Sequence, residues 1–172
     1  MRFNHGTARS LAAALVLTGG TAIAASNPAT TTFQVTATVL KACTVSATAL
    51  AFGNYTPTAG AVTNSSSISV ACTKTSPYTL TLNGGSTSGG TIGQRLMTNG
   101  TQTLQYNLYT SATYTTLLGD GSTSGSANVT GTGAGLSVPT TVNVYGKLPD
   151  SAANQSVPAG NYTDTITVSV AY

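Results

Sequence analysis

Few residues in this chain carry the side chains that catalysis requires. The 172 residues contain no glutamate, and the three aspartates are Asp120, Asp150 and Asp164. The single histidine is His5, close to the N-terminus. General acid–base catalysis needs a titratable group beside a nucleophile or a second carboxylate, and metal-dependent hydrolysis would lack imidazole ligands. Unless two of the aspartates meet in space, the chain offers no catalytic, metal-binding or cofactor-binding residue, and we expect no enzymatic activity.

The two cysteines, Cys43 and Cys72, are the other reactive side chains. An even number of cysteines in an exported chain indicates a disulfide, whereas a metal site would need more ligands than two thiolates. Apolar residues alternate with small polar ones in residues 67–72, which places Cys72 and therefore its partner on the inward face of a sheet. A closed loop of about 30 residues would restrict the unfolded chain by about 3 to 4 kcal/mol. We expect a structural disulfide; the alternative is two free thiols, which an oxidising compartment does not favour.

The first 24 residues have the pattern of a cleavable signal peptide. Arg2 and Arg9 form a positive region, residues 11–18 form a short apolar run, and residues 22–24 (Ala-Ile-Ala) supply the small side chains that a signal peptidase needs. The run is too short to span a bilayer. We expect cleavage after Ala24, with cleavage after the next residue as a close alternative. The other interpretation is an internal apolar helix.

The charges that remain after cleavage are few and scattered. The mature chain has four basic residues and three aspartates, which gives it a formal net charge of +1. The basic residues are Lys41, Lys74, Arg95 and Lys147. They form no basic patch for nucleic acid, and the glycine-rich residues 84–90 lack the Lys-Ser/Thr ending of a phosphate-binding loop. We therefore expect no nucleic-acid partner and no small-molecule substrate.

The composition and the hydrophobic pattern predict an all-β domain. Charged residues make up only 5% of the chain, hydrophobic residues 40%, and 19 glycines punctuate it. Disordered chains are instead rich in charge and poor in β-branched residues. Short alternating segments recur between turns, and no long segment of helical period appears. About seven such strands favour a single antiparallel β-sandwich of immunoglobulin-like type.

The two ends of the mature chain suggest how this sandwich is used. Residues 30–40 alternate Phe33, Val35, Ala37 and Val39 with polar residues, as a half-buried strand does. The sequence closes on a second alternating strand, in which Ile166, Val168, Val170 and Tyr172 face one way. An uncovered sheet edge beside an apolar groove promotes aggregation unless a strand fills it. One copy's N-terminal strand filling the groove of the next copy would build an open fibre; the alternative is an ordinary first strand of a closed sandwich.

An ordered set of short motifs resembles the spore coat protein U domain family. The motifs are Cys43-Thr44-Val45, Leu50-Ala51-Phe52-Gly53, the strand ending at Cys72, residues 104–109 (LQYNLY), Val144-Tyr145-Gly146, and residues 158–165 (PAGNYTDT) followed by alternating apolar residues to Tyr172. The family includes major subunits of archaic chaperone-usher pili.

The resemblance implies an incomplete immunoglobulin-like β-sandwich in residues 41–172, completed by donor-strand exchange. A periplasmic chaperone would first lend the missing strand, and an outer-membrane usher would polymerise the subunits into a homopolymer on the cell surface. Residues 25–40 would be the donor segment, with Phe33, Val35, Ala37 and Val39 entering the neighbour's groove. Ile166, Val168, Val170 and Tyr172 would line the acceptor edge that the chaperone contacts. The donor would end, and the subunit's own sheet begin, between Phe33 and Cys43.

Three functions compete. A pilus or fimbrial subunit that supports adhesion or biofilm formation is the favoured one. A secreted spore-coat or extracellular-matrix protein of the same fold and a glycan-binding adhesin are the alternatives. Exposed tyrosines such as Tyr109, Tyr114 and Tyr145 could contact sugars or host and abiotic surfaces, although ordinary packing on a sheet face is the more common role of such residues.

Overall fold

A computed structural model describes residues 28–172, so the expected signal peptide lies outside the described residues. The chain divides into two units, residues 1–38 and residues 39–172. The second unit is the compact domain described in this section. In the first unit, residues 28–38 form no helix or strand, and all of their side chains are exposed.

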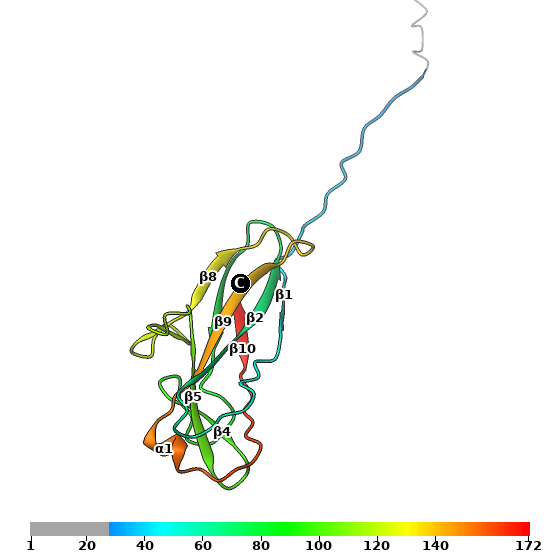
Figure 1. The fold of residues 1–172 in the computed structure, drawn as a ribbon. Helices are drawn as coiled ribbons and strands as arrows, with labels where there is room; N and C mark the ends of the chain where they lie inside the picture. The colour runs from blue at the N-terminus through cyan, green and yellow to red at the C-terminus, as the bar shows by residue number, and fades with distance from the viewer. Residues whose placement is uncertain (1–27) are drawn as a thin grey trace, which may run out of the picture. The chain divides into compact units, whose positions relative to one another are not determined.

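Ten strands and one short helix make up the described part of the chain, all in the second unit (Figure 1). The strands are β1 (Cys43–Ala47), β2 (Val62–Cys72), β3 (Pro77–Leu82), β4 (Arg95–Thr98), β5 (Thr103–Tyr109), β6 (Leu117–Leu118), β7 (Ser126–Ala127), β8 (Val129–Thr132), β9 (Thr140–Leu148) and β10 (Val168–Ala171). The helix is α1 (Ala152–Gln155). The sequence predicted about seven strands, and the structure has ten.

The strands form two sheets. The larger sheet has the order β1-β2-β9-β5-β6-β7, with β4 paired to β5, and the smaller sheet has the order β10-β3-β8. All neighbouring strands are antiparallel except β6 and β7. The longest ladder joins Val62–Val70 of β2 to β9. The predicted all-β, immunoglobulin-like class is therefore confirmed.

The core lies between the two sheets, and the side chains of every second residue along the strands fill it. On β3, β5 and β9 every second side chain is buried and its neighbours are more exposed, as expected for strands with one face on a core. The fully buried apolar side chains include Val70, Leu80, Leu118 and Leu148. The alternation predicted on β3 and β5 is confirmed, since Leu80, Leu82, Leu104 and Leu108 all face inward.

The disulfide predicted between Cys43 and Cys72 is present. The two residues lie directly opposite each other in the β1–β2 ladder, with Cα atoms 4.1 Å apart. Cys72 is buried, while Cys43 is the only residue of β1 that is even partly buried. Strand β1 is thus an exposed edge strand, held by its ladder to β2 and by this covalent bond.

The connection after β9 contains one turn of helix that the sequence did not predict. Ser151 caps α1, because its side chain accepts a hydrogen bond from the Asn154 backbone N–H. Asn154 is fully buried and binds the backbone of Gln105 on both sides: it accepts from the N–H at 2.8 Å and donates to the C=O at 2.9 Å. It also donates to the Pro149 carbonyl. This side chain fixes α1 against the edge of β5.

Candidate subunit interface

A groove of about 1240 Å³ opens into the core of the domain. Residues 47–57 form one side, called the first wall below, and residues 157–166 with Val168 form the opposite side, the second wall. The floor is apolar and consists largely of core residues. Its members are Ile68, Leu82, Met97, Leu104, Tyr106, Leu108, Val144 and Leu148. A single open groove therefore gives access to side chains from both sheets.

The groove lies where the sandwich lacks a strand. Strand β1 ends the larger sheet and β10 ends the smaller one, so each has one edge without a partner. The two strands are neighbours in space (Figure 1). A closed sandwich would have another strand along these free edges, covering the core. Only Ala47 of β1 and Val168 of β10 line the groove, so the uncovered part of the core lies between the segment that follows β1 and the segment that precedes β10.

The backbone of both walls makes few hydrogen bonds to other backbone groups. Residues 49–55 of the first wall make no backbone–backbone hydrogen bond. In the second wall, Thr163 exchanges two such bonds with Thr98, and no other residue from 157 to 166 makes one. Backbone N–H and C=O groups need partners, and an extended segment laid along a free edge supplies them. The walls can therefore accept a strand from elsewhere.

The predicted acceptor residues divide into two groups. Ile166 and Val168 line the groove. Val170 is half-buried and packs on the core beyond the groove. Tyr172 lies after the end of β10, is 56% exposed and does not line the groove. The structure thus brings two of the four predicted residues to the groove.

The predicted donor residues are exposed. Phe33, Val35 and Val39 are 86%, 80% and 87% exposed, and Ala37 is exposed as well. The alternation predicted a strand in residues 30–40, but residues 28–42 form none. The physical reason is that a strand needs a neighbouring backbone, and residues 30–40 make no backbone–backbone hydrogen bond to any other described residue. Their role as a donor stays a prediction.

Asp164 anchors the second wall, a role that the sequence did not predict. Its Oδ2 accepts a hydrogen bond from the Tyr106 hydroxyl at 2.7 Å. Its Oδ1 accepts from the backbone N–H and the hydroxyl of both Ser86 and Thr87, at 2.9 to 3.1 Å. Burial acts to raise the pKa of Asp164, but these hydrogen bonds outweigh it and hold the pKa below its ordinary value. Burial and the bond to Asp164 raise the pKa of Tyr106 far above its usual range.

Asp150 anchors the first wall in a similar way. Its Oδ1 accepts from the Tyr55 hydroxyl and from the Thr58 N–H, and its Oδ2 accepts from the Gly60 N–H at 3.0 Å. The Gln155 amide of α1 also donates to Oδ1, at 3.2 Å. The bond from Tyr55 is the main cause of the lowered pKa of Asp150. Burial and this same bond raise the pKa of Tyr55 to about 12.

The third aspartate, Asp120, belongs to a loop that does not line the groove. It accepts five hydrogen bonds from Ser122, Thr123 and Ser126. The bond from the Thr123 backbone contributes most to lowering its pKa. Each aspartate therefore binds a different segment, and no pair of them forms a catalytic site. Within residues 28–172, no cluster of His, Cys, Asp or Glu could hold a metal ion, and no helix is long and apolar enough to cross a membrane.

The tyrosines considered as contact residues form a cluster on the outer face of the larger sheet. Tyr109 lies opposite Tyr145 in the β5–β9 ladder and stacks edge to face with Tyr114 at 5.5 Å. The Lys147 ammonium lies 5.6 Å from the centre of the Tyr114 ring. All four side chains are partly exposed. They are thus packed against one another rather than held apart as separate contact sites.

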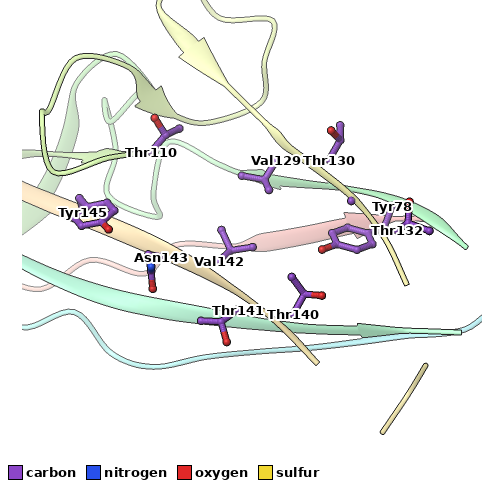
Figure 2. Close-up of a pocket in the computed structure, with 11 residues that line it drawn as sticks. Tyr78, Thr110, Val129, Thr130, Thr132, Thr140, Thr141, Val142, Asn143 and Tyr145 are labelled. Atoms are coloured by element: carbon purple, nitrogen blue, oxygen red, sulfur yellow. The ribbon is translucent and has the colours of Figure 1, made fainter. Parts of the chain in front are cut away.

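A second, smaller cavity of about 400 Å³ lies between β8 and β9 (Figure 2). Figure 2 shows threonine side chains around it, with Tyr78 at one end and Tyr145 at the other. Its lining contains no carboxylate, histidine or basic group. Hydroxyl groups alone supply no general base near neutral pH.

Comparisons with known proteins agree with the predicted resemblance. The family model described as "Spore Coat Protein U domain" matches residues 29–169. Protein U of Myxococcus xanthus is 34% identical over 166 residues, which cover 84% of this chain and 85% of that protein.

Among solved structures, the chain is similar to one in the crystal structure of the CsuC-CsuE chaperone-tip adhesion subunit pre-assembly complex from archaic chaperone-usher Csu pili of Acinetobacter baumannii. The identity is 26% and the TM-score is 0.52. The similarity covers 78% of this chain but only 40% of that one. The match of the family model to almost all of the described residues, together with the relative of similar length, shows that this chain belongs to the spore coat protein U domain family.

Proposed function

We propose that this protein is a structural subunit of a chaperone-usher pilus that polymerises by donating an N-terminal strand. One observation carries the proposal: an open groove, floored by the core of the domain, lies between the segment that follows edge strand β1 and the segment that precedes edge strand β10. The likeness to a chain of a pilus chaperone–subunit complex supports it. The three aspartates accept hydrogen bonds from separate segments of the chain, and there is no histidine beyond residue 5. These residues give no support to an enzymatic role.

Residues 25–40 of one copy are the proposed occupant of this groove in the next. Phe33, Val35, Ala37 and Val39 would enter the groove, and the polar residues between them would face outward. Full burial of each large side chain contributes about 1.5 to 3 kcal/mol, and the donor backbone would pair with the unpaired walls. Because the donor segment and the groove are different surfaces of the subunit, each contact is head to tail and the assembly continues as a fibre.

The pathway and the location follow from the same proposal. Before assembly, the uncovered core needs a temporary partner, and a periplasmic chaperone that lends a strand would provide it. An outer-membrane usher would then join the subunits, so that the homopolymer reaches the cell surface. The signal-like residues 1–24 supply the export step. We further propose that the fibre supports adhesion to host or abiotic surfaces, or biofilm formation.

Deletion of residues 25–40 from the precursor tests the donor segment. We expect this variant to be exported and to bind its chaperone, because its groove is intact, but to form no fibres in negative-stain micrographs. Fibres from the truncated protein would refute the proposal.

A pair of neighbouring substitutions tests which face of the donor is buried. Val35→Asp would place a carboxylate among apolar floor residues, at a cost of several kcal/mol, so it should prevent assembly. Thr36→Asp introduces the same charge on the alternate, outward face and should allow assembly. Size-exclusion chromatography with light scattering measures both. Equal assembly of the two variants would show that the strand register is different.

A coat or matrix protein of the same fold is the second candidate. The family description and the relative from Myxococcus xanthus, of which this chain covers 85%, favour it. Negative-stain microscopy of the secreted material separates the two candidates, since a pilus subunit yields thin fibres and a coat protein yields soluble subunits or a layer.

A further inference from the structure

We propose that Asp150 and Asp164 are positioning residues that keep the two walls of the groove apart so that an incoming strand can enter. This inference rests on the proposed function, because the ligand in question is the donor segment. Neither residue would pair with the donor itself. Each acts through the wall that it anchors.

The walls need such anchors because few hydrogen bonds join their backbone to the sheets. The first wall has no backbone–backbone hydrogen bond from residue 49 to residue 55, and the second has only the Thr98–Thr163 pair before residue 167. The floor between them is apolar. Burial of that floor would favour collapse of the walls onto it while the groove is empty. Contacts that oppose closure are therefore needed to keep a groove of about 1240 Å³ open.

Asp150 fixes the spacing of the walls at one end of the groove. Through the Tyr55 hydroxyl it holds the first wall, and through the Gln155 amide it holds α1, which immediately precedes the second wall. The helix itself cannot shift freely, because the buried Asn154 binds the backbone of β5. One carboxylate thus links both walls to a fixed point in the larger sheet.

Asp164 fixes the second wall further along. Its Oδ2 accepts from Tyr106, a floor residue of β5, and its Oδ1 accepts four bonds from Ser86 and Thr87. Gly85 has a φ of +98°, and a Cβ at this position would overlap the Asp164 carboxylate. The glycine-rich loop is therefore shaped to receive this side chain. Asp164 thus joins the second wall both to the glycine-rich loop and to the floor of the groove.

Loss of an anchor should lower the rate at which the donor associates with the groove and leave its dissociation rate unchanged. A wall that is correctly placed for only a fraction of the time reduces the effective affinity by that fraction. Once the donor is bound, its own backbone holds both walls, so the dissociation rate no longer depends on the anchor. A residue that merely stabilised the fold would lower the melting temperature without this difference between the two rates.

The experiment uses the full mature chain carrying Val35→Asp, which keeps the subunits from donating to one another and leaves the groove unaltered. A fluorescent peptide of residues 28–40 is the probe, and stopped-flow anisotropy gives its association and dissociation rate constants. Asp150→Asn and Asp164→Asn should each lower the association rate constant by about tenfold and leave the dissociation rate constant within about twofold.

Asp120→Asn is the matched control. Asp120 accepts five hydrogen bonds, the same number as Asp164, but its donors lie in its own loop and it lies outside the groove. This variant should lose stability and bind the peptide at the unaltered rates. If an aspartate variant fails to fold, Tyr55→Phe removes one hydrogen bond to Asp150, and Ser86→Ala/Thr87→Ala removes the two hydroxyl bonds to Asp164. Each should slow association in the same direction.

Two results would count against the inference in different ways. Association rates equal to those of Asp120→Asn would overturn the positioning role while leaving strand donation intact. Failure of the peptide to bind the Val35→Asp subunit at all would overturn strand donation, and the positioning role with it.

Discussion

Removal of the disulfide should weaken the domain by an amount that the structure allows to be calculated. The double variant Cys43→Ala/Cys72→Ala deletes a bond between residues 29 apart in sequence and directly opposite in the β1–β2 ladder. On the loop-entropy model, a closed loop of this length restricts the unfolded chain by about 12 cal/mol/K, which is about 3.6 kcal/mol at 25 °C. For a domain of this size that corresponds to a fall of roughly 10 °C in melting temperature.

The effect should be concentrated on β1. Apart from Cys43, every residue of this strand is exposed, so few buried contacts hold it once the bond is absent. The first wall of the groove begins at the end of β1, at Ala47. Loss of the bond should therefore also slow assembly, because one side of the groove is less well fixed.

Urea unfolding of three samples gives the measurement: the oxidised protein, the same protein after reduction, and the double variant. The reduced protein keeps both sulfur atoms, so it separates the cross-link from the loss of the buried Cys72 side chain. The slope of unfolding against urea should rise slightly without the cross-link, since the unfolded chain is less compact. A difference below about 1 kcal/mol between the oxidised and reduced proteins would refute the assignment of a major stabilising role to this bond.

Three further predictions concern the groove and its supports. Gly146→Ala should cost about 1 to 3 kcal/mol in urea unfolding and slow assembly, because a Cβ at this buried position meets the Leu50 side chain of the first wall within 3 Å; unchanged behaviour would mean that Leu50 moves aside freely. Since the pKa of Asp164 is lowered in the folded protein, its contribution to stability is complete above the ordinary value of 3.8 and is lost as the pH falls below it; urea midpoints measured down to pH 3 should therefore fall less steeply for Asp164→Asn than for the unaltered protein, and equal slopes would contradict this. Asn154→Ala should cost about 2 to 4 kcal/mol, because it leaves the backbone groups of Gln105 without their partner; a loss below 1 kcal/mol would indicate that water replaces the amide.

The strands of the core could be predicted from the sequence because their signal is local. In β3 and β5, apolar residues alternate with polar ones over the whole strand, and each apolar residue that the pattern assigned to the core is buried. The inward orientation of Cys72 could be predicted in the same way, since this residue ends an alternating strand. These features depend on side-chain period alone, and a single chain displays it fully.

The walls of the groove could not be predicted in this way. Residues 49–55 and 157–162 adopt irregular conformations set by side chains distant in sequence, such as Asp150, which binds residues 90 to 95 positions away. A short polar residue in a loop gives no periodic signal that would reveal such a partner. Residues 30–40 show the opposite case, because their pattern is that of a strand while none of residues 28–172 pairs with them to form one.

Arg95 is a further residue that composition would have placed at the surface. It is fully buried, with Nε and Nη2 donating to the Asn83 carbonyl and Nη2 also to the Leu118 carbonyl. Its Nη1 is the one buried side-chain nitrogen or oxygen of residues 28–172 without a partner. Burial lowers its pKa, against the opposing influence of Tyr106 and Asp164. Backbone carbonyls that converge only in the folded state are what make this position available to a cation.

The position of the disulfide also determines how the domain would respond to a pulling force. Cys43 is the first residue of β1, and Cys72 is the last residue of β2, which pairs with β9 over nine residues. Tension applied to the chain ahead of Cys43 would pass through the sulfur atoms directly into this long ladder. It would load those hydrogen bonds together along the strand axis, and would not peel β1 away one pair at a time.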